Sequence, residues 1–472
     1  MIARMVRPSR EDHATQPVRS RVRDLKRAVR VSRSHLRRAD GGWLQPQRGP
    51  QKVDSYDEFR EFSSGDTKLA KVTQVMDPVR NPFVPGAGNP PPELAGRSLL
   101  LDQAKIALQR VAQQRHSQSL ILVGLRGVGK TVLLNRMKDM AETLGYRAHL
   151  LEAHEGKPFP ELLVPALRSA LMSISTVESA RSYARRAMRV LASFVRALKV
   201  TVNDVEYGID LEAGTADSGD IEADLPDLLQ AVGEAAKAAQ RPVAILIDEM
   251  QYMTEKEFSA IIMAVHRASQ QALPVLMIGA GLPQIIGLAG ESKSYAERLF
   301  RFPRIGALTH DDAQQAIVNP LRTEGVHIEP AALQLILSHT ERYPYFLQQW
   351  GHDSWNVAQN EIITQDDVVR AYSVAIKTLD ESFFRVRFDR CSPAEKRYMR
   401  ALAELGAGTH RSGDIAEVLG LKTTSVAPTR ANLIRKGMIF SPSHGDTEFT
   451  VPLFDAYMRR ELPYFFDDEE RD

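Results

Sequence analysis

The chain has 472 residues, with 61 Lys or Arg against 59 Asp or Glu, and a single cysteine, Cys391. This length predicts two or three domains, and one cysteine excludes an intramolecular disulfide and a cysteine-based zinc site. The longest largely apolar segment, 272–282, is about half as long as a bilayer span requires. No apolar stretch follows the basic residues near Met1, so we expect a cytoplasmic protein that does not enter the membrane.

Residues 1–92 are expected to form a basic arm followed by a linker. Residues 1–40 hold twelve Lys or Arg against four Asp or Glu, and such an arm either neutralises nucleic-acid phosphates or remains a solvated, irregular tail. The tail, or translated sequence upstream of the true start, is the favoured interpretation. A short helical piece is expected at 22–36. Residues 81–92 are rich in Pro and Gly, cannot be helical and predict a domain boundary.

The next predicted elements surround a glycine-rich loop. An apolar strand at 120–123 leads into the loop and an amphipathic helix follows it, which is the setting of the nucleotide-binding pattern GxxxxGKS or GxxxxGKT. Backbone N–H groups and the helix N-terminus favour phosphate there, so Lys130 is expected to contact the β- and γ-phosphates of ATP or GTP, and Thr131 to hold Mg²⁺. A chance match in a glycine turn is the alternative. The residues expected around the nucleotide are Gly124, Leu125, Arg126, Gly127, Val128, Gly129, Lys130, Thr131 and Val132.

A second apolar strand, at 243–247, ends in two acids, Asp248 and Glu249. The pattern resembles a Walker B strand, in which the first acid joins the Mg²⁺ shell and the second polarises the attacking water. Two solvated carboxylates at a strand end are the alternative. A carboxylate directly after the Mg²⁺ ligand favours hydrolysis over binding alone.

Strand signals recur at 147–152, 243–247 and 275–278, with helical patterns between them. This alternation predicts an α/β fold, a parallel sheet with helices on both faces, within a core at 93–310. A helical lid is expected at 311–390.

An insertion at about 155–225 is expected to hold an arginine-rich helix at 179–198 and a hairpin at 200–211. The arginines form either a phosphate-facing stripe or, as favoured, an ordinary exposed helix face.

With these elements placed, residues 93 to about 375 resemble an AAA+-related P-loop ATPase, similar to the archaeal-type ATPases of the STAND branch and to archaeal origin-binding initiator ATPases. The resemblance implies that Arg97, with Leu94 and Gly96, borders the base, and that Gln251 is the polar residue after the acids. It also implies a lid motif at Pro344, although Arg342 stands where the family has glycine.

The strand at 275–283 occupies the sensor-1 position of this family, yet it ends in no Asn, Thr or Ser. The resemblance also implies an arginine that acts on the nucleotide of a neighbouring subunit. Arg298 and Arg301 are the candidates and Arg298 is preferred. An ion pair of Arg298 with Glu297 or Glu291 is the alternative.

Residues 391–465 are expected to form a separate module, followed by an acidic tail at 466–472. Three helices, at 392–403, 412–419 and 425–436, precede two strands around a turn at His444, and together they resemble a winged helix-turn-helix. The resemblance implies a third helix in the DNA major groove. Basic residues barely exceed acidic ones in the module, so a protein partner is the alternative. The residues expected to contact DNA are Thr424, Thr429, Arg430, Lys436 and His444.

The sequence as a whole favours Mg²⁺-dependent ATP binding and hydrolysis coupled to duplex DNA through the C-terminal module. Lys130, Glu249 and Arg298 are the residues expected to act on the reaction, the last of them in a homo-oligomer. The alternative is a slowly hydrolysing regulatory switch or scaffold whose C-terminal module holds a protein partner. A third interpretation is a small-molecule kinase with the same loop, and the lid and the extra module argue against it.

Overall fold

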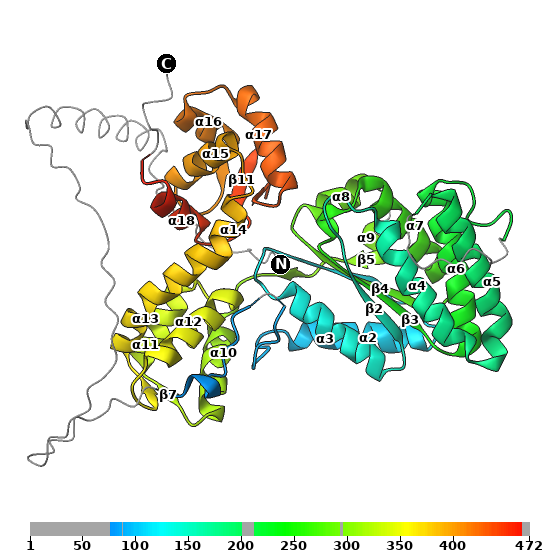
Figure 1. Ribbon diagram of the computed structural model, residues 1–472, viewed down its shortest axis with the longest axis horizontal. Helices are drawn as coiled ribbons and strands as arrows, with labels where there is room; N and C mark the ends of the chain where they lie inside the picture. The colour runs from blue at the N-terminus through cyan, green and yellow to red at the C-terminus, as the bar shows by residue number, and fades with distance from the viewer. Residues whose placement is uncertain (1–75, 87, 201–211, 293–295, 465–472) are drawn as a thin grey trace, which may run out of the picture. The chain divides into compact units, whose positions relative to one another are not determined.

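The computed structural model describes residues 76–86, 88–200, 212–292 and 296–464 (Figure 1). The arm before residue 76, the helical piece expected at 22–36, nearly all of the hairpin expected at 200–211 and the acidic tail lie outside these residues. None of the helices in the described ranges is long and apolar enough to cross a membrane.

The core contains a sheet whose strands all pair in parallel, as predicted. The strand order is β2-β3-β4-β1-β5. β5 pairs with the start of β1, and β6 pairs with the end of β1. The strands are β1 (Ser119–Gly124), β2 (Arg147–Glu152), β3 (Val243–Asp248), β4 (Val275–Gly281), β5 (Phe300–Arg301) and β6 (Arg304–Ile305). Because carboxyl ends of parallel strands share one edge, the chain leaving β1 and the chain leaving β3 emerge on the same side of the sheet.

Every residue of β1 and of β3 is buried, as expected where helices cover both faces of a parallel sheet. Successive side chains alternate between two cores. Leu120 and Leu122 of β1 pack in one core, and Ile121 and Val123 pack in the other. The apolar run in the sequence therefore reflects burial on both faces.

Helices cover both faces of this sheet (Figure 1). Leu108 of α2 and Met137 of α3 share the core of Leu122, whereas Leu163 of α4 and Phe258 of α7 share the core of Ile121. The helices of the core are α2 (Ser98–Ala112), α3 (Lys130–Thr143), α4 (Phe159–Ser175), α5 (Arg181–Ala197), α6 (Ile221–Ala239), α7 (Glu255–Gln270), α8 (Ile285–Ser292) and α9 (Ala296–Leu299), with short 3-10 turns at Glu178–Ala180 and Met250–Tyr252.

The arginine-rich helix of the insertion is α5, and three of its arginines form ion pairs. Arg189 lies 2.9 Å from Glu212, and Arg186 lies 3.5 Å from Glu212 and 3.2 Å from Glu234. Arg181 pairs with Glu178. These arginines are engaged by acids of the same region, which supports the exposed-face interpretation over a phosphate-facing stripe.

A group of four helices follows the core where the lid is expected. Its aromatic interior includes Phe346, Trp350 and Phe384, all fully buried, and the side chain of Thr364 caps one helix in a capping box with Asp367. The elements are α10 (His310–Thr323), α11 (Pro330–His339), α12 (Pro344–Val357) and α13 (Gln365–Thr378), a short parallel strand pair β7 (His327–Ile328) and β8 (Ile362–Ile363), a π-helix at Leu379–Phe384, and α14 (Arg385–Phe388).

The C-terminal module contains the three helices and the hairpin that the sequence predicts. A capping box between Ser392 and Glu395 starts the first helix, as the sequence indicates. A short strand and a final helix complete the module, and neither was expected. The elements are α15 (Pro393–Glu404), β9 (His410–Arg411), α16 (Ser412–Leu419), α17 (Thr423–Arg435), β10 (Ile439–Phe440), β11 (Asp446–Phe449) and α18 (Phe454–Glu461), and the antiparallel sheet has the order β10-β11-β9.

Candidate functional site

The glycine-rich loop connects β1 to α3 at the carboxyl edge of the sheet. Gly124 lies so close to β6 that a Cβ on it would approach the carbonyl oxygen of Ile305 to 2.4 Å, and only glycine avoids this clash. α3 starts at Lys130, directly after the loop, and has 14 residues. The unpaired N–H groups of its first turn and its dipole make this helix end favourable for an anion.

Lys130 is buried, and its Nζ donates to the carbonyl oxygens of Gly124 and Leu125 at 3.1 and 3.0 Å. Burial lowers the pKa of Lys130, while Glu249 and Asp248 oppose the shift. The carbonyl oxygens therefore hold the ammonium group inside the loop, where the sequence predicts contact with phosphate.

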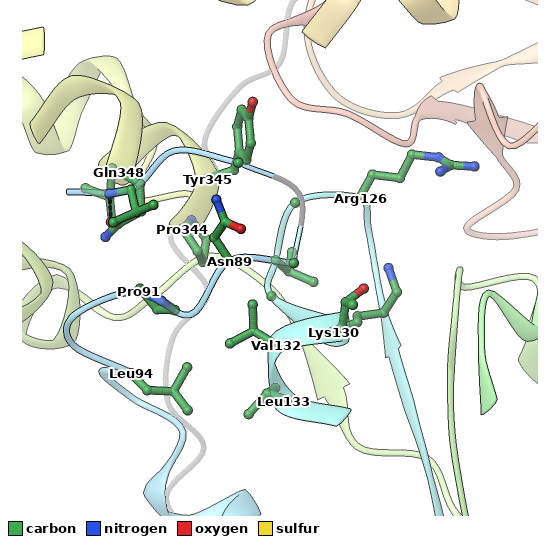
Figure 2. A pocket seen from close by; sticks show the side chains of 18 of the residues that line it. Asn89, Pro91, Leu94, Arg126, Lys130, Val132, Leu133, Pro344, Tyr345 and Gln348 are labelled. Carbon is green, nitrogen blue, oxygen red and sulfur yellow. Dashed lines mark hydrogen bonds between the residues drawn. The ribbon is translucent and has the colours of Figure 1, made fainter. Parts of the chain in front are cut away.

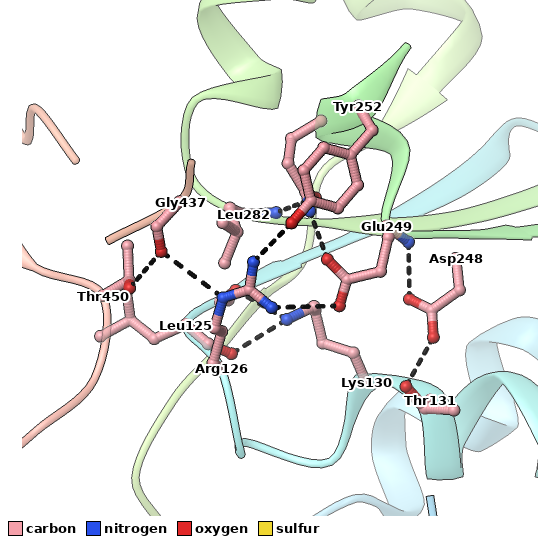
Figure 3. Close-up of polar contacts among 12 residues, drawn as sticks. Leu125, Arg126, Lys130, Thr131, Asp248, Glu249, Tyr252, Leu282, Gly437 and Thr450 are labelled. Carbon is pink, nitrogen blue, oxygen red and sulfur yellow. Dashed lines mark hydrogen bonds and ion pairs between the residues drawn. The ribbon is translucent and has the colours of Figure 1, made fainter. Parts of the chain in front are cut away.

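Thr131 and Asp248 form a hydrogen-bonded pair. Thr131 Oγ1 donates to Asp248 Oδ2 at 2.5 Å, and the N–H of Glu249 donates to Asp248 Oδ1 at 2.8 Å (Figure 3). Burial raises the pKa of Asp248, and the hydrogen bond from Thr131 opposes that shift. A hydroxyl and a carboxylate are hard oxygen ligands, and Mg²⁺ in nucleotide sites combines one or two protein ligands with phosphates and waters.

No group of three or more His, Cys, Asp or Glu side chains that could hold a metal ion occurs among the described residues. The pair of Thr131 and Asp248 therefore fits Mg²⁺ that arrives with a nucleotide, and does not form a complete metal site by itself.

Glu249 follows Asp248, but its carboxylate has different partners. Gln251 Nε2 donates to Glu249 Oε2, and Arg126 Nη1 lies 3.9 Å from Glu249 Oε1 (Figure 3). Gln251 also accepts a hydrogen bond from the N–H of Leu282 at 3.0 Å. The expected polar residue after the acids thus connects Glu249 to the chain that leaves β4, the strand at the sensor-1 position.

A cavity of about 550 Å³ adjoins these side chains, a size that suits a small ligand. Its walls come from the loop and α3, from the lid, and from the chain preceding α2. The lining residues labelled in Figure 2 include Pro344, Tyr345 and Gln348 from the lid and Lys130 and Val132 from α3. The predicted site residues that line the cavity are Arg97, Arg126, Gly127, Val128, Gly129, Lys130, Thr131, Val132, Asp248, Glu249 and Pro344, whereas Gly124 and Leu125 contribute only the carbonyl oxygens described above.

Arg97 lies at the cavity and also holds the loop. Its Nη2 donates to the carbonyl oxygen of Gly306 at 2.7 Å and to that of Val128 at 3.5 Å. Burial lowers the pKa of Arg97, and Asp312 opposes the shift. The residue therefore supports the loop backbone from the side where the resemblance expects the base.

The lid contacts the glycine-rich loop through two tyrosines. Tyr343 Oη donates to the carbonyl oxygen of Arg126, and the N–H of Tyr345 donates to the carbonyl oxygen of Gly127 at 3.2 Å. Burial raises the pKa of Tyr343, so its hydroxyl stays protonated and able to donate. The loop is thus hydrogen-bonded to the residues on both sides of Pro344, the first residue of α12.

Arg342 stands where the resemblance expects glycine, and its backbone adopts the conformation that glycine favours. Its φ is +60°, in the left-handed region that L-residues rarely occupy. The chain before Pro344 therefore has a backbone conformation that glycine would adopt more easily than arginine.

Residues 81–92 are expected to be a linker at a domain boundary, and five of them, Val84, Gly86, Gly88, Asn89 and Pro91, line the cavity. Phe83 is buried against α12, so close that a Cβ on Gly351 would lie 2.7 Å from its ring. Asn81 Nδ2 donates to the carbonyl oxygen of His352 at 3.0 Å. The Pro- and Gly-rich composition predicts a non-helical chain here, and the single apolar ring of Phe83 was the available signal that this chain packs against the lid.

Arg387 is a cavity residue that sequence reasoning missed. It lies on α14, donates from Nη1 to the carbonyl oxygen of Phe383, and stacks 4.1 Å from the centre of the Phe383 ring. Burial lowers the pKa of Arg387 to about 10, with a further contribution from Arg126, while Tyr345 and Glu249 oppose the shift. No ion pair joins Arg387 to a carboxylate in the part of the chain that the structure describes.

Arg298, expected to act in a neighbouring subunit, is exposed on α9 and does not line the cavity. Its carbonyl oxygen accepts from Gln118 Nε2 at 2.9 Å, and Arg301 Nε donates to Gln118 Oε1 at 2.8 Å. The Arg298 side chain therefore does not contribute to the cavity of its own chain.

Two of the basic residues expected to contact DNA are engaged inside the C-terminal module. Arg430 Nε donates to Thr447 Oγ1 at 2.9 Å, and Nη2 donates to Ser441 Oγ at 2.8 Å. Lys436 Nζ lies 2.7 Å from Glu395 Oε2. These contacts connect α17 to the hairpin and to α15, which gives both side chains a role in holding the module together.

The other three residues expected to contact DNA are at least partly accessible. Thr424 on α17 and His444 in the hairpin turn are exposed, and Thr429 is half-buried. Lys422 and Arg435, at the two ends of α17, are exposed as well. The accessible basic charge of this helix thus lies at its ends.

Family comparison identifies the region that contains the loop and the acidic strand. The family described as "AAA ATPase domain" matches residues 93–278, which include β1, α3 and β3. These residues form an AAA ATPase domain. A second family, described as "Domain of unknown function (DUF8462)", matches residues 381–458, which run from the π-helix through the C-terminal module. A search of curated proteins found no match.

Several solved structures are similar to this chain over more than the AAA ATPase domain. One is the Orc1 protein of Aeropyrum pernix in complex with DNA, which is 14% identical, with a TM-score of 0.42, over 82% of this chain and 97% of that one. Cdc6p from Pyrobaculum aerophilum is 14% identical, with a TM-score of 0.40, over 82% of this chain and 100% of that one. The RuvB Holliday junction branch migration motor of Thermotoga maritima is 13% identical, with a TM-score of 0.38, over 78% and 95%.

Proposed function

We propose that the AAA ATPase domain binds ATP together with Mg²⁺ and hydrolyses it. The observation that carries this proposal is that Lys130, Thr131, Asp248 and Glu249 all line one cavity beside the N-terminus of α3. Lys130 and the N–H groups of the loop neutralise phosphate oxygens. Thr131 and Asp248 would hold Mg²⁺, which would offset the negative charge of the phosphates.

Glu249 is the residue proposed to accept a proton from the attacking water. A general base must lie within hydrogen-bond reach of that water, and Glu249 borders the same cavity as Lys130. Its position one residue beyond Asp248 lets the two carboxylates serve different partners, as they do in the structure.

The test is phosphate release by the purified full chain without any acceptor substrate. Lys130→Ala should weaken ATP binding about tenfold or more, because it removes a buried cation from the phosphate site. Lys138→Ala on the same helix is the matched control, since Lys138 pairs with Glu142 at 2.8 Å away from the cavity. Release that occurs without an acceptor sets aside a small-molecule kinase.

Glu249→Gln separates hydrolysis from binding. It should keep ATP affinity within about twofold and lower kcat about 100-fold, the scale of general-base catalysis. Unchanged turnover in this variant would refute the assignment of Glu249.

For the C-terminal module we propose a winged helix that couples the nucleotide state to duplex DNA. The support is its three helices and hairpin, with exposed Lys422, Thr424 and Arg435 on α17 and exposed His444 in the turn. Binding to duplex DNA should weaken steeply with salt, because it depends on phosphate neutralisation. Lys422→Gln should reduce both the affinity and the salt dependence.

A second candidate is a slowly hydrolysing switch whose module holds a protein partner. The engagement of Arg430 and Lys436 inside the module favours it, because those cations are not free for phosphates. DNA binding that is absent or insensitive to salt, together with slow phosphate release, would select this candidate.

We also propose that Arg298 acts on the nucleotide of a neighbouring copy. Its exposure outside its own cavity supports a role in trans. Arg298→Ala should lose phosphate release, and mixing it with Glu249→Gln should restore part of it, because each copy then supplies what the other lacks. Mixing two inactive variants without recovery would exclude this role.

A further inference from the structure

Arg126, in the middle of the glycine-rich loop, contacts the C-terminal module. Its N–H donates to the carbonyl oxygen of Thr450 at 3.3 Å, and its Nε lies 3.5 Å from the carbonyl oxygen of Gly437. Thr450 and Gly437 belong together, because Thr450 Oγ1 donates to the same Gly437 oxygen at 2.6 Å. These two residues flank the hairpin of β10 and β11, so Arg126 is bound by the base of that hairpin.

The opposite side of the same guanidinium faces Glu249. Arg126 Nη2 donates to Tyr252 Oη at 2.9 Å, and Nη1 lies 3.9 Å from Glu249 Oε1 (Figure 3). The Arg126 and Glu249 side chains are only 17% and 19% exposed, so solvent screens their attraction less than it would on the surface. One side chain therefore connects the C-terminal module to the residue proposed to activate water.

This arrangement occupies the carboxylate of Glu249. Gln251 Nε2 donates to one of its oxygens, and Arg126 lies beside the other. The hydrogen bond from Gln251 and the attraction of Arg126 together hold the Glu249 carboxylate in this orientation. A general base must turn to within hydrogen-bond reach of the attacking water, so this orientation is a resting position.

Gly437 allows the C-terminal module to approach Arg126 this closely. A Cβ at Gly437 would lie 2.9 Å from Arg126 Nη2 and 2.9 Å from Leu282 Cδ1. Its φ of +65° also lies in the region that favours glycine. The contact therefore depends on a position in the module that carries no side chain.

We infer that Arg126 is a positioning residue through which the C-terminal module restrains ATP hydrolysis. With the base of the hairpin on the loop, Gly437 and Thr450 hold Arg126 beside Glu249, and the carboxylate keeps its resting orientation. Displacement of the module frees Arg126, and Glu249 is then able to turn toward the phosphates. This inference rests on the proposed ATPase activity and adds its regulation by the module.

Gly437→Ala in the full chain tests the restraint from the module's side, without changing a residue that lines the cavity. The expected result is a kcat for phosphate release about tenfold higher, equivalent to about 1.4 kcal/mol of barrier, with KM for ATP changed less than about twofold. Gly445→Ala is the matched control. Gly445 also has a positive φ, of +82°, but a Cβ there would meet no atom within 4 Å, so the backbone strain is similar and the contact with Arg126 remains.

A double variant, Gly437→Ala with Glu249→Gln, should abolish the gain, which shows that the added turnover passes through Glu249. Tyr252→Phe provides an independent route, because it removes the hydroxyl that holds Arg126 Nη2 and lies outside the cavity lining. It should also raise kcat, and it decides the question if Gly437→Ala does not fold. Arg126→Lys should keep more restraint than Arg126→Met, since a cation remains beside Glu249.

An unchanged or lower kcat in folded Gly437→Ala overturns the inference. If Gly437→Ala does not fold, the same result in Tyr252→Phe overturns it. In either case, turnover by the wild type leaves the proposed function intact. The same holds if Gly445→Ala raises kcat equally. Absence of phosphate release from both the wild type and Gly437→Ala contradicts the proposed function itself, and the inference with it.

Discussion

Replacing Arg387 by methionine should raise the stability of the nucleotide-free protein and weaken its binding of ATP. Arg387 is a partly buried cation at the cavity, and burial lowers its pKa to about 10. The shift corresponds to a net cost of about 3 kcal/mol for the charged form. Methionine fills much of the same space without that charge.

Part of this gain is lost with the favourable contacts of Arg387. Its stacking on Phe383 and its hydrogen bond to the carbonyl oxygen of that residue are together worth about 2 kcal/mol. We therefore expect a net stabilisation of about 1 kcal/mol, or an unfolding temperature about 2 °C higher. Because the pKa is lowered in the folded state, the full cost of the charge is present at every pH below about 10, begins to fall as the pH rises above that value, and is lost only above the ordinary pKa of arginine. The gain should therefore be constant across the neutral range.

ATP affinity should change in the opposite direction. A guanidinium at a partly desolvated phosphate site contributes about 2 kcal/mol, so Arg387→Met should weaken ATP binding about 30-fold. The assays are calorimetric titration with ATP and Mg²⁺ and thermal unfolding without nucleotide. Arg385→Met is the matched control, since Arg385 lies on the same short helix, is 48% exposed and pairs with Glu461 at 2.8 Å. Lower stability with unchanged ATP affinity in Arg387→Met would show that the residue only packs.

Two further predictions concern the cavity wall and the magnesium ligand. Phe83→Ala removes a buried ring, at a cost of about 3 kcal/mol, so the chain around Phe83 should leave α12 and ATP affinity should fall about tenfold in a fluorescence titration. Val79→Ala, at a side chain 91% exposed, should change neither, and equal affinities in the two variants would contradict the role of this wall. Asp248→Asn removes a buried carboxylate whose pKa is raised. The charged carboxylate lowers the stability of the folded protein at every pH above its folded pKa, and the variant lacks this cost. The unfolding temperature at neutral pH should therefore rise. The same variant should lose the strengthening of ATP binding by Mg²⁺, and wild-type binding should weaken with acid at a higher pH than an ordinary aspartate would give; a titration with and without Mg²⁺ across pH checks both.

The sequence predicted the elements whose signals are local. β2 begins and ends where the apolar pattern at 147–152 does, and α16 matches the segment at 412–419, because periodicity, caps and glycines define such elements within a few residues. β5, β6 and β9 have two residues each, too few for any periodicity. These short strands form because backbone groups of neighbouring strands are available for hydrogen bonds, and the local sequence pattern gives no sign of such neighbours.

The site divides in the same way. Lys130, Thr131 and Asp248 belong to motifs with fixed spacing, and the structure places them together. Arg387 belongs to no motif, and it reaches the cavity only because the π-helix and α14 continue from the lid. The contact between Arg126 and Gly437 joins residues 311 positions apart in the sequence, so it became visible only with the fold.

The charges around the cavity give a physical reason for the proposed binding of Mg²⁺ with the nucleotide. Four acidic and four basic side chains line it, namely Glu93, Glu152, Asp248, Glu249, Arg97, Arg126, Lys130 and Arg387. The lining is therefore nearly neutral, and a triphosphate would bring its negative charge close to Asp248 and Glu249 without a surplus of cations to offset it. A divalent cation held by Thr131 and Asp248 would supply the missing positive charge at the point where those carboxylates would repel phosphate. Arg126 contributes to the same balance of charge. In the inferred restraint, its cation offsets the charge of Glu249 while the C-terminal module holds Arg126 in place. When Arg126 moves away, the Glu249 carboxylate is again an uncompensated negative charge that can accept a proton from water.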